Sequence, residues 1–395
     1  MAKDFPPIFR FVILGVSTLC VTIVLSNMII YNFTKICAEP YGQVRQPGQT
    51  NFTRMSSDFT KVEQTFLKAA SAIGALVAGF PYTYLFQRYP ARYSFLSAGV
   101  ISVVSTALVP ITYHLGFGYF FAVRIIQGVA FSSTFQFYGC VTADWATLDE
   151  HGIFLAFLSG STQISNIFTM PVSGALCDSP IGWPSVYYIH AGLCFVLFIL
   201  WLLIFRDHPQ NHGAVGAIEL EIITRGKVEK ADSDKRETIP YFQILTDPST
   251  LSVWLATFSE LLYVQLVSQY EPIYFNEYLN FDVMNSGFSS DALTCVSPTT
   301  NVRICNTIAA GASGIFMIAL AFIKRENKIL CVVGITVAVS VTGFVTSGYN
   351  KCATLRSRQH AHFDMTQIMN VWAITILIEP FIVDAILTDH QSESQ

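Results

Sequence analysis

An arginine lies inside an otherwise apolar run. In "YFFAVRIIQGVAF", residues 119–131, Arg124 follows five apolar residues and precedes two. At a helix centre in lipid, such a side chain costs about 2.5–3.5 kcal/mol on insertion scales. A guanidinium stays charged and forms paired hydrogen bonds to a carboxylate or phosphate. The run therefore indicates an anion-binding residue that faces a watery cavity. The alternative is an arginine about 9 Å into its span that snorkels to the membrane surface.

A carboxyl group, Glu260, lies near the middle of a second apolar run, residues 251–271. A carboxyl group in apolar surroundings is protonated more readily than one in water. Glu260 is therefore a candidate partner for Arg124 or a carrier of a coupling proton. The alternative is a neutral acid bonded to a neighbouring backbone carbonyl, without a role in transport.

Other polar side chains inside apolar runs are weaker candidates. Gln163 and Asn166 lie in "FLAFLSGSTQISNIFTMPVSGALC", where the many small residues favour close helix packing. These two side chains and Tyr82 are long enough to reach a cavity, although a lone tyrosine is more often structural. Glu379 and Asp384 are expected to face packed protein or the headgroup region. Nine cysteines without a CxxC pair or a His/Cys cluster predict no metal site, and no cofactor is expected.

The apolar runs that carry these residues are long enough to cross a membrane. The chain is 52% hydrophobic and 13% charged, against about 25% charged for a soluble domain. Apolar stretches of about 18 residues or more are typical of spanning helices. The sequence predicts an all-α integral membrane protein with ten spans, at 11–31, 64–86, 93–113, 118–141, 152–176, 184–205, 251–271, 306–323, 329–348 and 367–388. The net charge of −4 gives no indication of nucleic-acid binding.

The spans fall into two groups. We expect an N-terminal six-helix bundle at 1–205, a cytoplasmic linker at 206–250 and a C-terminal bundle at 251–395. This layout is typical of two-halved secondary transporters, whose substrate site lies between the halves near the midplane. Lysines and arginines before the first span and in the linker favour a cytoplasmic N-terminus. An "NFT" sequon at Asn51 is a candidate glycosylation site in the first outer loop.

"VRIIQGVAF", together with "TMPVSGALCDSPIGWPSVYY", closely resembles the major facilitator superfamily. Within it, the chain resembles the organic-anion and phosphate symporter branch that includes sialin and the vesicular glutamate transporters, and in particular its nematode-type members. The resemblance implies a two-bundle, alternating-access carrier. It also implies that Arg124 matches an arginine of the fourth helix that contributes to anion recognition in relatives. In relatives the loop after the second helix latches the two halves, so Arg88 and Arg92 are implied as gating residues.

The sequence also departs from that family pattern. Relatives that carry glutamate have a further arginine where this chain has Ser26, and another near Glu260. In the gating loop an acidic residue is replaced by Gln87. The sequence therefore predicts that glutamate is not the substrate. Between Leu293 and Pro298 the chain has only a few residues where relatives carry an eighth helix, and it ends where relatives continue into a twelfth. The second bundle is therefore expected to be incomplete.

Two functions from different classes follow. The first is a secondary transporter, acting as a monomer in a plasma, vesicular or lysosomal membrane, that couples a small organic or inorganic anion to H⁺ or Na⁺. The second is a transport-dead truncated isoform that acts only through interactions or is degraded. An enzyme is not expected, because the chain has no HExxH motif, acidic metal cluster or nucleophile elbow.

Overall fold

The computed structural model describes residues 8–34, 59–177, 179–225 and 361–393, together with residues 227, 315 and 318 and ten positions between 251 and 266. Two predicted functional residues, Glu260 and Asn51, lie outside the described residues. The predicted spans 306–323 and 329–348 lie outside them wholly or almost wholly, and 251–271 does so in part.

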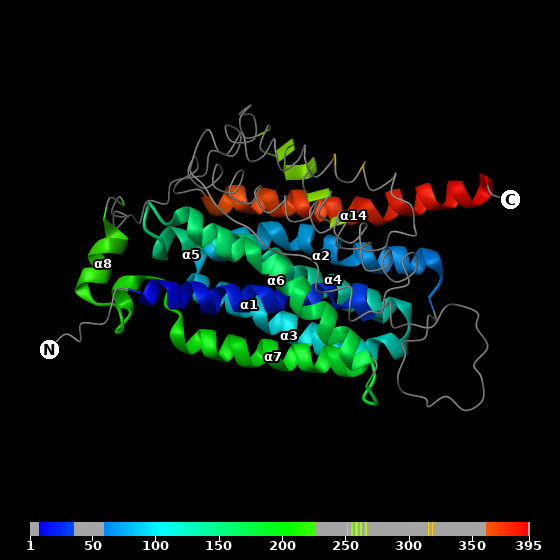
Figure 1. Ribbon diagram of the computed structural model, residues 1–395, viewed down its shortest axis with the longest axis horizontal. Helices are drawn as coiled ribbons and strands as arrows, with labels where there is room; N and C mark the ends of the chain where they lie inside the picture. The colour runs from blue at the N-terminus through cyan, green and yellow to red at the C-terminus, as the bar shows by residue number, and fades with distance from the viewer. Residues whose placement is uncertain are drawn as a thin grey trace.

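The described part of the chain is built from helices without strands (Figure 1). The long helices are α1 (Phe9–Thr34), α2 (Lys61–Arg88), α3 (Ala91–Leu115), α6 (His151–Cys177), α7 (Pro184–Ile204) and α14 (Ala361–Glu393). All six are long and apolar enough to cross a membrane, with the α14 segment at Met365–Val383. The prediction of an all-helical membrane fold is confirmed in this part, and these spans match predicted spans within a few residues.

The fourth predicted span, 118–141, differs from the prediction because it is divided into two helices. These are α4 (Phe117–Ser132) and α5 (Thr134–Trp145), which meet at Ser133. There the hydroxyl of Ser133 donates to the Ala130 carbonyl at 2.9 Å, and the hydroxyl of Thr134 donates to the Phe131 carbonyl at 2.9 Å. Hydroxyl groups that bond back to the preceding turn bend a helix. The Ser-Ser-Thr sequence thus interrupts one crossing rather than ending it.

Helix α2 begins three residues before its predicted start because its first turn is capped. The hydroxyl of Thr60 accepts the Glu63 backbone N–H at 3.3 Å, and the Glu63 carboxylate accepts the Thr60 N–H at 2.8 Å. This capping box satisfies two backbone donors that a helix start leaves free. It fixes where the chain enters the bundle.

The helices pack side by side with nearly parallel or antiparallel axes (Figure 1). Helix α1 lies against α6 and α7, and α2 lies between α4 and α14. An aromatic cluster fills the space between α3, α5 and α7, where the rings of Phe95 and Phe137 stack at 3.8 Å and Trp201 packs edge-on against both. The α1–α7 part therefore has its own core, and α14 is joined to it through α2 and α5.

The first part of the predicted linker is folded. It contains a short 3₁₀ turn, η2 (Pro209–Asn211), and the helix α8 (Ala217–Thr224). Lys227 donates from Nζ to the carbonyl oxygens of Ala143 and Asp144, at 2.9 and 3.1 Å. The segment is thereby held against the end of α5.

Candidate anion site

The Arg124 side chain points into the bundle, between α1 and α2. Nη1 donates to the Met28 carbonyl at 2.8 Å, and Nε donates to the Leu67 carbonyl at 3.3 Å. The guanidinium carbon lies 5.1 Å from the centre of the Tyr31 ring, a cation–π distance. Only 3% of the residue is exposed. This placement differs from the snorkelling alternative, in which the charge would reach the outer surface.

A second polar side chain on α4 orients the guanidinium. Gln127, one helical turn after Arg124, accepts from Nη1 at 2.9 Å. Its amide nitrogen donates to the Asn27 carbonyl and to the Thr106 hydroxyl, both at 3.2 Å. The Asn27 side chain in turn donates to Ser102 at 2.8 Å. This network links α4 to α1 and α3, so the direction of the cation is set by three helices.

The Arg124 charge is hydrogen-bonded but not neutralised. Its acceptors are two backbone carbonyls and one amide oxygen, and the phenol groups of Tyr31 and Tyr187 also interact with its charge. Within the described part of the chain no carboxylate pairs with it, and Nη2 donates no hydrogen bond. Carbonyl dipoles solvate a cation but leave its net charge in place. A buried unpaired cation is costly, and a bound anion would remove that cost.

Two glycines bring α2 and α4 close enough for the Leu67 contact. A Cβ on Gly128 would lie 1.8 Å from the Ser71 carbonyl oxygen, and a Cβ on Gly74 would lie 1.9 Å from the Ile125 carbonyl oxygen. Any side chain at either position would collide with the backbone of the other helix. Small residues at such positions allow membrane helices to pack backbone to backbone. The glycine of "RIIQG" is therefore explained by close packing of α4 on α2, beside Arg124.

The other predicted binding residues are not joined to Arg124. Tyr82 is buried beside Phe86, with ring centres 6.3 Å apart, and lies about 22 Å farther along α2 than Leu67 at 1.5 Å per residue. Gln163 and Asn166 are half-buried on α6, and neither side chain makes a hydrogen bond within the described residues. The structure thus brings Arg124 together with Gln127 and Tyr31, which the sequence did not single out.

The two predicted gating residues lie at the ends of neighbouring helices. Arg88 is exposed in the last turn of α2. Arg92, in the first turn of α3, donates its backbone N–H to the Asp207 carboxylate at 2.8 Å, and its guanidinium donates to the Leu202 carbonyl. Arg92 is therefore bound to the end of α7 and the start of the linker. These contacts join the N-terminal half to the start of the linker, whereas a latch would join the two halves.

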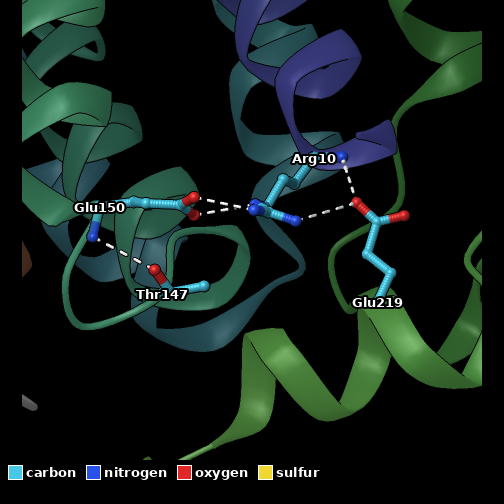
Figure 2. A network of polar contacts seen from close by, with 4 residues as sticks. All are labelled: Arg10, Thr147, Glu150 and Glu219. Atoms are coloured by element: carbon cyan, nitrogen blue, oxygen red, sulfur yellow. Dashed lines mark hydrogen bonds and ion pairs between the residues drawn. The ribbon is translucent and has the colours of Figure 1, made fainter. Parts of the chain in front are cut away.

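A charged network that the sequence did not reveal lies at the start of α1 (Figure 2). The Arg10 guanidinium donates to both oxygens of Glu150, each at 2.8 Å, and the Arg10 backbone N–H donates to Glu219 on α8 at 2.9 Å. Hydrogen bonding from Arg10 holds the pKa of Glu150 below its ordinary value. The network ties α8 to the bundle. Its partners are 140 and 209 residues from Arg10, so no local sequence signal joins them.

Comparison with known proteins relates this geometry to a family. The model of the Major Facilitator Superfamily matches residues 11–378. Two solved structures share the fold: the proton:xylose symporter XylE (TM-score 0.65, 12% identity, covering 98% of this chain and 90% of that one) and a bacterial homolog of the human lysosomal transporter Spinster (0.61, 11%, 94% and 81%).

Sequence relatives narrow the comparison. Human sialin is 24% identical over 71% of this chain and 62% of its own length. Human sodium-dependent phosphate transport protein 1 is also 24% identical, over 71% and 57%. The Caenorhabditis elegans uncharacterized transporter slc-17.3 is 24% identical over 72% and 59%. The matched region thus spans about three fifths of the length of these relatives. The predicted resemblance to the organic-anion and phosphate symporter branch is confirmed.

Proposed function

Because this chain belongs to the major facilitator superfamily, we propose that it is a secondary carrier that moves a small organic or inorganic anion across a membrane. Transport is coupled to H⁺ or Na⁺ and proceeds by alternating access between two bundles, 1–205 and 251–395, joined by a linker at 206–250. Names of relatives support an anionic substrate, since they include a sodium-dependent phosphate transport protein, a vesicular glutamate transporter and a probable urate exporter. In this proposal Arg124 is the cation that binds the substrate.

The observation that carries the proposal is the unneutralised charge of Arg124. Its guanidinium is buried and is fixed by α1, α2 and Gln127, but no described acid pairs with it. A fixed, poorly hydrated cation binds an anion strongly, because the protein has already borne the cost of removing water from the charge. Nη2, which makes no hydrogen bond to the described residues, would donate the first hydrogen bond to the anion. Tyr31 would then line the same site through its ring.

The contacts of Arg124 also suggest how binding is linked to movement. Its acceptors belong to α1 and α2, so an anion that draws the guanidinium away competes with the Met28 and Leu67 carbonyls. Each charge-assisted hydrogen bond of this kind contributes about 1.5–3 kcal/mol. When the anion replaces these carbonyls as the acceptor, the contacts that hold α1 and α2 to Arg124 change. The anion then binds one arrangement of the helices more tightly than the other, and any ligand-driven conformational change requires such a difference.

For the membrane setting we propose a plasma, vesicular or lysosomal membrane, with the N-terminus and the linker on the cytoplasmic side. The Arg10 network and α8 would then lie at the cytoplasmic end of the bundle. Lysines and arginines concentrate on that side of a membrane protein. The carrier is proposed to act as a monomer.

Uptake by reconstituted protein tests the proposal. Proteoliposomes are prepared with the native chain, with Arg124→Gln or with Arg225→Gln. Uptake of labelled phosphate, urate and glutamate is then measured for each. Arg225 is exposed at the end of α8 and serves as the matched control. Loss of a buried charge partner costs about 2–5 kcal/mol, so uptake by Arg124→Gln should fall thirty-fold or more while Arg225→Gln stays native-like. Equal uptake by all three proteins would exclude Arg124 from the site, and no uptake of any anion by the native chain would refute the carrier.

A further inference from the structure

Helices α2 and α14 pack in an antiparallel arrangement along much of their length (Figure 1). Three contacts set their register. The rings of Phe66 and Phe381 meet edge to face at 5.5 Å. Farther along α2, Gly79 faces the Asn370 side chain, to which a Cβ would approach within 2.5 Å. Still farther, the hydroxyls of Thr83 and Thr366 lie 2.9 Å apart.

This register places two buried charged residues at the same level along the helix pair. Lys68 follows Phe66 by two positions on α2, and Glu379 precedes Phe381 by two on α14. Lys68 is 8% exposed and Glu379 is 1% exposed. The two interact electrostatically. The sequence predicted that Glu379 would face packed protein or headgroups, and the structure places it in packed protein.

The Glu379 carboxyl group is buried without hydrogen bonds. Neither of its oxygens accepts a hydrogen bond in the described part of the chain. A buried carboxylate is expected to accept several hydrogen bonds or to pair with a cation. Here the ionised form is favoured by Lys68, and the neutral acid is favoured by the apolar surroundings. Two opposing influences of this kind are what a site that binds and releases protons requires.

The other described contacts of α14 lie about two turns before Glu379 and are made by Trp372. On the α4–α5 side, α14 meets the rings of Phe131 and Phe135 through Trp372, whose indole N–H donates to Gln265. These groups are uncharged at neutral pH. On α2, Glu63 lies more than a helical turn before Lys68 and is engaged in the capping box. Among the described residues, Lys68 is therefore the charged side chain that acts on Glu379.

The pair is also connected to Arg124. The carbonyl that accepts from Arg124 Nε belongs to Leu67, the residue before Lys68. Helix α2 therefore contacts α4, which carries Arg124, and α14, which carries Glu379. Close packing at Gly74 and Gly128 fixes α2 against α4. A change in charge on the α14 side of α2 thus occurs one residue from the candidate anion site.

We propose that Glu379 is the proton-binding site of this protein and that Lys68 transmits its charge state to the anion site; the second part rests on the proposed carrier function. A proton from water adds to one carboxylate oxygen of Glu379 and gives a neutral carboxylic acid, while Lys68 keeps its ammonium group. The net charge of the pair changes from zero to +1 beside Arg124, so proton binding favours anion binding. By linkage, the anion favours proton binding to the same extent. The coupling ion is therefore H⁺.

The proton site is tested by infrared spectroscopy on the purified full-length protein, without any substrate. A carbonyl-stretch band of a protonated buried carboxyl group should appear as the pH is lowered from 9 to 5. It should be absent in Glu379→Gln and present in Glu221→Gln, an exposed acid on α8. In Lys68→Gln it should persist to higher pH, because the charge that favours the carboxylate is gone. A band that never titrates, or one that survives in Glu379→Gln, overturns the proposal.

Coupling is tested by uptake of labelled inorganic phosphate into proteoliposomes, with and without an inward proton gradient. The gradient should stimulate the native protein about five-fold or more, the lower end of ordinary coupling strengths. Two variants are compared: the single variant Glu379→Gln, and the double variant Lys68→Gln with Glu379→Gln, which leaves no unpaired lysine. Both should retain phosphate exchange, but the proton gradient should no longer stimulate it. Stimulation that persists in both overturns the coupling. Failure of the carrier function can be told apart from failure of the proton site. If the chain is not a carrier, no phosphate, urate or glutamate enters the vesicles. The infrared band would still titrate and support the proton site.

Discussion

Alanine in place of Gly128 should separate two helices that carry the candidate anion site. The new Cβ would lie 1.8 Å from the Ser71 carbonyl oxygen, whereas ordinary contact begins near 3.4 Å. The obstacle is backbone in the middle of α2, so no side-chain rotation removes it. The two helices must move apart locally by about 1.6 Å. Overpacking of this kind costs about 3 kcal/mol.

The same movement should weaken the anion site. The bond from Arg124 Nε to the Leu67 carbonyl is already 3.3 Å long, near the limit for a hydrogen bond. A separation of more than 1 Å at the next turn of α4 would break it. Gly128→Ala is therefore expected to reduce anion affinity as well as stability, which distinguishes it from a defect remote from the site.

Thermal unfolding of the detergent-purified protein measures the first effect. Gly118→Ala is the matched control, because it lies on the same helix and its Cβ would meet nothing within 4 Å. The control should be unchanged or stabilised by up to about 1 kcal/mol, the propensity difference between glycine and alanine. Gly128→Ala should unfold at a temperature lower by about 3–5 °C. Equal melting temperatures for the two variants would refute the close approach of α2 and α4.

The Arg10 network gives two further predictions. Arg10→Gln leaves Glu219, 2% exposed in its side chain, without its cationic partner and should destabilise the protein by about 3 kcal/mol; urea unfolding against Arg225→Gln, which should be neutral, measures this, and equal stabilities would contradict it. The pKa of Glu150 is lowered from its ordinary value of 4.5, chiefly by hydrogen bonding from Arg10. Its stabilising contribution should therefore be complete above pH 4.5 and be lost as the pH falls below it. Glu150→Gln should show a shallower loss of stability between pH 5 and 3 than the native protein, and parallel curves would refute the assignment.

The crossings were predictable from the sequence because lipid imposes a simple constraint. A helix that spans about 30 Å needs roughly twenty apolar residues, and such runs are visible without knowledge of their neighbours. The first three spans and the fifth and sixth match α1, α2, α3, α6 and α7 within a few residues. The interruption at Ser133 was not visible, because it depends on whether hydroxyl groups bond to the preceding turn or point elsewhere.

The polar contacts within the bundle were much less predictable. A permanent charge in an apolar run predicted that Arg124 faces a watery cavity, but its acceptors in the structure are mainly backbone carbonyls, which carry no sequence signal. No sequence feature related Lys68 on α2 to Glu379 on α14. Only the antiparallel register of α2 and α14 brings them together, and that register depends on packing between segments far apart in the chain.

The central claim is that a buried, unneutralised guanidinium binds the transported anion. The most direct measurement is the thermal stabilisation of purified protein by phosphate, urate or glutamate, because a ligand that binds only the folded state stabilises it by an amount that rises with the logarithm of its concentration divided by its Kd. The native protein should be stabilised by at least one of them, Arg124→Lys more weakly because lysine lacks the planar fork, and Arg124→Gln not at all. If Arg124→Gln were stabilised as strongly as the native protein, the anion would bind elsewhere and the proposed site would be wrong.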